Sequence, residues 1–126
     1  MTKEDKELLL QDLCARLPYG VVCKDTNINV VGILSQIGLH YDMCVLDKDN
    51  GESESCYLPN CKPYLFPISS MTEEQREEFH KHCLSDMFGI LFYTEETYGW
   101  LNANHFDYRR LINKGLAIDA TGLNIY

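Results

Sequence analysis

The chain has 126 residues and a formal net charge of −8 at pH 7. This length predicts a single domain covering residues 1–126. The acid excess repels phosphate backbones and anionic lipid surfaces, so we expect no direct nucleic-acid binding and no membrane attachment. No apolar run approaches the roughly 20 residues of a membrane span, and Met1–Leu17 does not have the pattern of a secretory signal. We therefore expect a cytoplasmic protein whose six cysteines are reduced.

The first predicted element is a helix over residues 3–16. Thr2 is a favourable N-cap, and the acidic residues that follow it suit the positive end of the helix dipole. Within the helix, apolar side chains recur at helical spacing, at Leu9, Leu10, Leu13, Cys14 and Leu17. Pro18 and Gly20 end the helix. This stripe must pack on another element, because so short a helix is not stable alone.

Residues 19–67 alternate short β-type runs with turn signals. Many runs are apolar at consecutive positions, which predicts that both faces of the sheet are covered. Gly32 within a strand pattern suggests a bulge or sharp bend. Asn50-Gly51 predicts a hairpin with a type I′ turn. Pro63 and Pro67 lack backbone donors, so the last run is an edge strand or an extended crossing.

Helical and β signals are mixed in residues 68–126. Thr72 and Gln75 form a capping-box pattern that opens a helix over 73–85 with a narrow apolar seam. Further along the chain we expect a strand at 90–94, a loop at 95–99, a helix from Asn102 or Asn104 to about 113, and an extended tail at 119–126.

These elements predict an α+β fold. Its centre is a small SH3-like antiparallel β-barrel or curled sheet over residues 19–67, analogous to SH3 in strand number and spacing. An N-terminal helix within residues 1–18 and a C-terminal helical and β extension over 68–126 flank it. Such a fold is compatible with many functions and indicates none by itself.

Three strings carry a resemblance: LCARLPYGV, CKPYLFPISSMTEEQ and WLNANHFDYRRLINKGLA. With them the chain resembles a family of small uncharacterised proteins from gut anaerobic bacteria, their prophages and mobile elements. The resemblance covers nearly the whole chain and is weakest at residues 81–99. It implies a phage or mobile-element context, and it implies no activity, cofactor or catalytic residue.

Candidate chemistry is weak in this sequence. Cys56, Cys61, His80 and Cys83 supply zinc-type ligands, but their spacing is not a common zinc pattern and no C-x2-C is present. We expect these cysteines to be small buried residues, with no metal and no cofactor. No nucleophile motif, paired-carboxylate site, phosphate loop or dinucleotide fingerprint appears, so no enzymatic activity is predicted.

Aromatic residues and one Arg-Arg pair make a binding surface the leading interpretation. The predicted partner-binding residues are Tyr64, Trp100, His105, Tyr108 and Arg109. The predicted function is that of a non-enzymatic interaction or accessory protein of phage or mobile-element origin that binds another protein, and a homodimer is also plausible. One alternative is an acidic nucleic-acid mimic that blocks a DNA-binding partner, based on the charge within 73–96. Another is a small zinc protein or enzyme.

Overall fold

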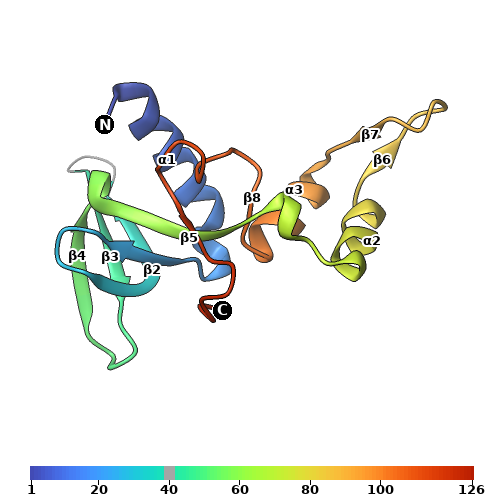
Figure 1. The fold of residues 1–126 in the computed structure, drawn as a ribbon. Helices are drawn as coiled ribbons and strands as arrows, with labels where there is room; N and C mark the ends of the chain where they lie inside the picture. Colours follow the sequence, from blue (N-terminus) through green and yellow to red (C-terminus); the bar gives the residue numbers. More distant parts are fainter. Residues whose placement is uncertain (39–41) are drawn as a thin grey trace.

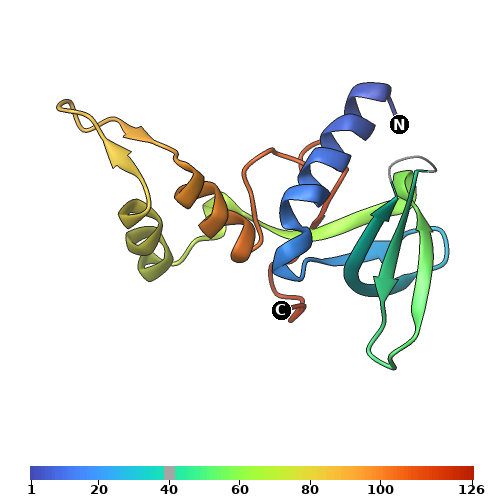
Figure 2. The same ribbon diagram turned by 180° about the vertical axis from the view of Figure 1, so that it is seen from behind.

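The computed structural model describes residues 1–38 and 42–126. A curled sheet forms one end of the molecule, with helix α1 packed across it (Figure 1). The long strand β5 leaves this sheet and leads to a smaller group of helices. From that group a narrow β-hairpin projects away from the rest of the chain, and Figure 2 shows the same projection from behind.

Helix α1 spans Lys3–Arg16, which confirms the predicted bounds. The Thr2 hydroxyl caps it by accepting the Asp5 N–H at 3.1 Å. Its inner face buries Leu9 and Leu13, as the leucine spacing predicts. The same face also buries two charged residues, Asp12 and Arg16, which the apolar stripe did not indicate. The 3₁₀ turn η1 (Leu17–Tyr19) follows and ends at Gly20.

The sheet is mixed and open. Strands β1 (Val22–Asp25), β2 (Val30–Gly38), β3 (Met43–Asp47), β4 (Ser53–Tyr57) and β5 (Cys61–Pro67) pair in the antiparallel order β4-β3-β2-β1-β5. Beyond β1, strand β5 pairs in parallel with the short strands β8 (Phe106–Asp107) and β9 (Ile118–Asp119). The predicted antiparallel curled sheet over residues 19–67 is confirmed for β1–β5. The barrel alternative is wrong, because the sheet does not close and the far end of β5 pairs with the late strands.

Both prolines of β5 lie in stretches that pair with a neighbouring strand. Pro63 lies opposite Cys23 of β1, and Pro67 lies opposite Asp107 of β8. Strand β5 is therefore an extended crossing between the sheet and the helical region, as predicted (Figure 1), and not an edge strand. The 3₁₀ turns η2 (Leu58–Asn60) and η3 (Ile68–Ser70) flank it.

One face of the sheet remains uncovered. Leu34 and Leu46 are buried, whereas Val31 and Ile33 of β2 are exposed at 43% and 48%. The prediction that both faces are covered is therefore wrong, because α1 and the C-terminal segments pack on the other side. Gly32 allows close approach of strand β3, since a Cβ there would lie 2.6 Å from the Asp47 carbonyl oxygen. The actual irregularity in pairing falls between Leu34 and Gln36.

The β3–β4 hairpin is at the predicted place with a different turn. Lys48 N–H donates to the Glu52 carbonyl at 2.8 Å, and Gly51 N–H donates to the Lys48 carbonyl at 3.0 Å. Gly51 has a positive φ of 84°, and Asn50 does not. This is a type I turn followed by a glycine bulge rather than a type I′ turn, because the loop is three residues long.

The first helix after β5 begins where the sequence predicts. Helix α2 spans Glu73–Lys81, and the capping box between Thr72 and Gln75 is present. It ends four residues before the predicted position 85. Strands β6 (Leu84–Ser85) and β7 (Leu91–Phe92) then form a separate two-stranded hairpin, so only part of the predicted 90–94 strand exists.

The next helix is displaced from its predicted position. Helix α3 spans Glu95–Ala103, so the expected loop at 95–99 and the expected helix to 113 are both wrong. The reason is a second capping box, in which Thr94 and Thr97 each accept the backbone N–H of the other. The sequence T-E-E-T at 94–97 thus repeats the T-E-E-Q signal at 72–75. Residues 106–107 are strand β8, and residues 111–115 form turns.

Candidate functional site

The most unusual surface is the projecting hairpin of residues 84–93, called here the hairpin arm (Figures 1 and 2). Each of its large apolar side chains is exposed, and Met87 and Phe88 at the tip are exposed at 90% and 80%. A folded chain rarely presents so many neighbouring apolar groups to solvent without a function for them. The exposed apolar residues of the arm are Leu84, Met87, Phe88, Ile90, Leu91, Phe92 and Tyr93.

The tip of the arm is a well-defined turn. The Asp86 carboxylate accepts the N–H groups of Phe88 and Ile90, at 2.8 and 2.9 Å. Asp86 N–H donates to the Ile90 carbonyl at 3.0 Å, and Gly89 N–H donates to the Asp86 carbonyl at 3.1 Å. Gly89 supplies the positive φ of 78° that this turn requires. These bonds hold Met87 and Phe88 outward in one conformation.

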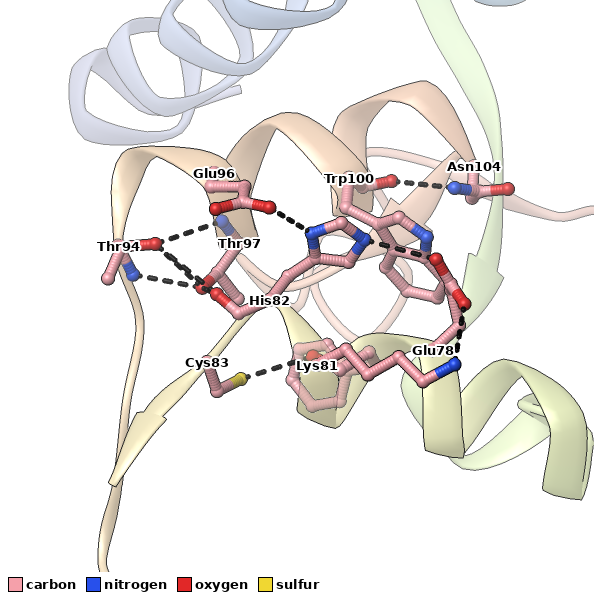
Figure 3. A network of polar contacts seen from close by, with 10 residues as sticks. Glu78, Lys81, His82, Cys83, Thr94, Glu96, Thr97, Trp100 and Asn104 are labelled. Atoms are coloured by element: carbon pink, nitrogen blue, oxygen red, sulfur yellow. Dashed lines mark hydrogen bonds and ion pairs between the residues drawn. The ribbon is translucent and has the colours of Figure 1, made fainter. Parts of the chain in front are cut away.

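His82 fixes the base of the arm (Figure 3). Its carbonyl oxygen accepts the hydroxyls of Thr94 and Thr97, so the two ends of the arm are joined at the start of α3. Its ring nitrogens lie 2.7 Å from a Glu96 carboxylate oxygen and 3.3 Å from one of Glu78. The histidine thus connects α2, the arm and α3 through both its backbone and its side chain.

Aromatic packing joins the base of the arm to the sheet. Phe79 of α2 meets Tyr93 edge-on, with ring centroids 5.4 Å apart, and Trp100 at 5.9 Å. Trp100 stacks on His82 at 6.0 Å and on Phe106 of β8 at 5.6 Å. This row of rings gives the arm a rigid foundation, since aromatic pairs add to the free energy gained by burial alone.

Negative charge surrounds the base of the arm. Every glutamate of α2 and of the first turn of α3 is exposed. Lys81 is 3.7 Å from the Glu78 carboxylate, and exposed pairs of this kind contribute little. The apolar arm therefore rises from an acidic surface made by Glu73, Glu74, Glu77, Glu78, Glu95 and Glu96.

Three of the residues predicted to bind a partner take part in internal packing, although Trp100 and His105 are only partly buried. Tyr64 is buried in the sheet, and Trp100 belongs to the row of rings described above. His105 stacks on Tyr126 with centroids 3.6 Å apart. Burial, and to a lesser extent the charge of Arg16, lower the pKa of His105 to about 4. These positions support the fold, so their substitution is expected to affect stability.

The other two predicted residues lie together beside α1. The Arg109 guanidinium donates to the Asp12 carboxylate and to the Tyr108 hydroxyl, both at 2.8 Å. Asp12 also accepts from the Nε of Arg16 at 2.8 Å. Tyr108 and Arg109 line a shallow cavity with Gln11, Ala15, Tyr98 and Asn102. The five predicted residues therefore do not form one surface.

Sequence reasoning missed the hairpin arm. The sequence predicted a helix over 73–85 and a single strand at 90–94, because the β-runs on either side of the turn are only two residues long. A usable signal was present in D-M-F-G-I, where Asp86 and Gly89 hold the positions that a short hairpin turn favours, between apolar residues.

The candidate zinc ligands fall into two separate groups. Cys56 and Cys61 are buried in the sheet core, and the third thiol close to them is that of Cys44. Cys83 packs in the aromatic cluster instead, with its thiol donating to the Phe79 carbonyl at 3.4 Å, and His80 is exposed on α2. Figure 1 places α2 at the opposite end of the molecule from β3 and β4.

Comparison with known proteins identifies no relatives: no family model, no curated protein and no solved structure matches the chain. Within the described residues, no helix combines the length and the apolar character needed to cross a membrane.

Proposed function

We propose that this is a non-enzymatic interaction protein that binds another protein through its hairpin arm. The observation that supports this most directly is the exposure of every large apolar side chain between Leu84 and Tyr93 on a turn held by the Asp86 carboxylate. The binding surface thus differs from the five residues that the sequence indicated.

The arm has the properties of a segment that a partner covers. A two-stranded hairpin is marginally stable in water by itself. Leu84 pairs with Phe92 and Ser85 pairs with Leu91, so successive residues Leu91 and Phe92 place apolar groups on both faces of this ribbon. Apolar groups on both faces favour insertion into a cleft over contact with a flat surface.

The negative charge around the base of the arm indicates the kind of surface that a partner should have. The exposed glutamates of α2 and α3 favour a protein whose apolar cleft has a basic rim, because such charges steer association. The same glutamates disfavour an anionic membrane. They also disfavour a second copy of the chain, since pairing two arms would bring two acidic surfaces together.

The sheet is the scaffold in this proposal. Its order β4-β3-β2-β1-β5, with the 3₁₀ turn η2 between β4 and β5, resembles that of an SH3-like barrel that has opened at one side. We extend the proposal to a cytoplasmic protein of a phage or mobile element, in keeping with the family that the sequence resembles. Neither extension affects the test of the arm.

The test begins with a photoreactive amino acid at Phe88 and, as a control, at Tyr57 on the sheet edge. The protein crosslinked at Phe88 is then purified, and its dissociation constant is measured for two double variants. We expect Met87→Ser with Phe88→Ser to weaken binding at least about 30-fold, which is the effect of one hot-spot residue.

The matched control is Val31→Ser with Ile33→Ser, which removes two exposed apolar side chains from the sheet face. We expect this variant to bind within about threefold of wild type. Equal binding by the arm variant, or equal losses in both variants, would exclude the arm as the interface.

The six exposed glutamates also support the nucleic-acid mimic as a second candidate. The two functions differ in salt dependence, because exposed charge pairs are screened and apolar burial is not. We expect the purified complex to persist in about 0.5 M salt. Dissociation there, together with strong binding by the arm variant, would favour the mimic. Self-association through the arm in sedimentation experiments would indicate a homodimer instead.

A further inference from the structure

A cluster of thiols lies within the curled sheet, far from the hairpin arm. The Sγ atoms of Cys44, Cys56 and Cys61 all lie within 4.8 Å of one another. Each of the three residues is almost fully buried. Among the described residues this is the one place where three or more potential ligand atoms converge.

The topology explains the convergence. Cys44 and Cys56 are directly opposite each other in the β3–β4 ladder. The 3₁₀ turn η2 then reverses the chain, so that Cys61 at the start of β5 returns to the same interior. Strands β4 and β5 are not paired with each other. The thiols of Cys56 on β4 and Cys61 on β5 are nevertheless within 4.8 Å of each other, so the open sheet comes close to closing at this point.

A fourth thiol lies next to this group. Cys23 of β1 is buried in the same core, two positions before Asp25, which lies opposite Cys61 in the β1–β5 ladder. Four cysteines from four strands therefore face one interior. Four thiolates in a tetrahedron are a common structural zinc site.

A buried negative charge accompanies the thiols. Asp25 of β1 is 4% exposed, and its charge acts on both Cys44 and Cys56. Its carboxylate accepts the Asn27 N–H at 2.9 Å, and within the described chain no cation pairs with it. Four thiolates around one Zn²⁺ carry a net charge of −2, so Asp25 does not favour a metal here and its charge must be outweighed by the zinc–sulfur bonds.

We propose that Cys44, Cys56 and Cys61, with Cys23 as fourth ligand, bind one Zn²⁺ ion inside the sheet. Zinc–sulfur bonds of about 2.3 Å in a tetrahedron require sulfur atoms about 3.8 Å apart, so Cys44, Cys56 and Cys61 need to contract by about 1 Å at most, and Cys23, which lies outside this group, must move in to complete the tetrahedron. Zinc fits better than a monovalent copper ion, because the divalent ion neutralises more of the charge of the four thiolates. The site has no open position, which makes its role structural.

Zinc binding must release protons. Each ligand thiol loses its proton to solvent as its sulfur joins the metal, up to four protons for one ion. Zinc affinity is therefore expected to rise steeply with pH.

The test uses the full chain, refolded under reducing conditions with zinc and then dialysed. We expect about one zinc ion per chain by metal analysis and a higher melting temperature than after chelation. Replacing zinc with Co²⁺ should give the absorption spectrum of tetrahedral thiolate coordination. Wild type alone provides both readouts, so they do not depend on whether any variant folds.

Variants locate the metal. We expect Cys44→Ala with Cys61→Ala to lose the zinc and the Co²⁺ spectrum. Two controls should retain both: Cys14→Ser with Cys83→Ser, which removes thiols outside the cluster, and His82→Gln, which removes the surface histidine beside two glutamates. A wild-type stoichiometry near zero, a cobalt spectrum without thiolate character, or zinc retained by the cluster variant would each overturn the proposal.

Discussion

The sheet end of the molecule buries charged side chains, whereas the hairpin arm exposes apolar side chains. Both differ from the usual arrangement, in which charged groups face solvent and apolar groups are buried. Around α1 the protein buries an ion pair, Asp12 with Arg16, in which both side chains are inaccessible to solvent. In the arm it exposes Met87 and Phe88. The buried pair has its partners within the chain, whereas the apolar tip does not. The comparison indicates that the buried ion pair serves the fold itself, whereas the exposed tip of the arm is suited to contact with another molecule.

The largest contrast is expected from the same substitution at two aspartates. Asp12→Ala leaves the buried guanidinium of Arg16 without its carboxylate and should lower the free energy of unfolding by about 3 to 5 kcal/mol. Asp86→Ala loosens the tip of the arm and should change global stability by less than about 0.5 kcal/mol. Urea denaturation measures both. Similar losses at the two positions would show that the arm is part of the cooperative core.

Acid should weaken the sheet end through His105. Its pKa is about 4 in the folded protein, below the ordinary value of 6.5, because burial and Arg16 disfavour the charged ring. The unfolded chain therefore binds more protons between these values. Stability is fully present above pH 6.5 and falls as pH decreases toward 4, by at most roughly 3 kcal/mol.

Denaturation at a series of pH values tests this expectation. The variant His105→Asn, chosen because Asn tolerates the positive φ of 63° at this position, should show a shallower decline over the same range. An unchanged slope would assign the acid sensitivity to other groups.

Substitution of two glycines of β2 is expected to have intermediate effects on the free energy of unfolding. A methyl group at Gly32 would overlap the Asp47 carbonyl oxygen, so Gly32→Ala should cost about 1 to 3 kcal/mol. At Gly38 the nearest atom, the Met43 carbonyl oxygen, is 3.4 Å away, and Gly38→Ala should cost little. Thermal denaturation of the two variants distinguishes a specific clash between β2 and β3 at Gly32 from a general loss of stability when a side chain is added to β2. Equal stability of the two variants would contradict the packing described here.

The smallest effect is expected from removing the apolar tip. Met87→Ser with Phe88→Ser should leave the melting temperature within about 2 °C of wild type, because neither side chain is buried in the free protein. Amide hydrogen exchange should also be faster in residues 84–93 than in β1–β3. Strong protection of the arm in the isolated protein would contradict its independence from the sheet end.

Local signals in the sequence predicted local structure well. Thr2 defined the start of α1, Thr72 and Gln75 defined the start of α2, and Asn50-Gly51 located the β3–β4 hairpin. In each case a side chain or a glycine satisfies a nearby backbone group, so the information lies within a few residues. The same capping signal is present at Thr94 and Thr97, where the sequence prediction placed a loop over 95–99.

Features that depend on distant parts of the chain could not be predicted in this way. Strands β8 and β9 are two residues each, and they exist because β5 supplies a partner. The thiol cluster joins four strands with irregular spacing, so no motif could indicate it. For the arm, the sequence offered the turn residues but no sign that its apolar groups remain uncovered.

The hydrogen bonds of Arg16 and Tyr126 have a consequence for the order of folding. Arg16 donates to the carbonyl of Phe106, and the Tyr126 hydroxyl accepts the Val22 N–H while donating to the Tyr64 carbonyl. The first helix and first strand therefore acquire these partners only after residues 106 and 126 have been synthesised. Closure of loops this long slows folding, so the nascent segment containing α1 and β1 is expected to stay open to proteases and chaperones until those residues are available.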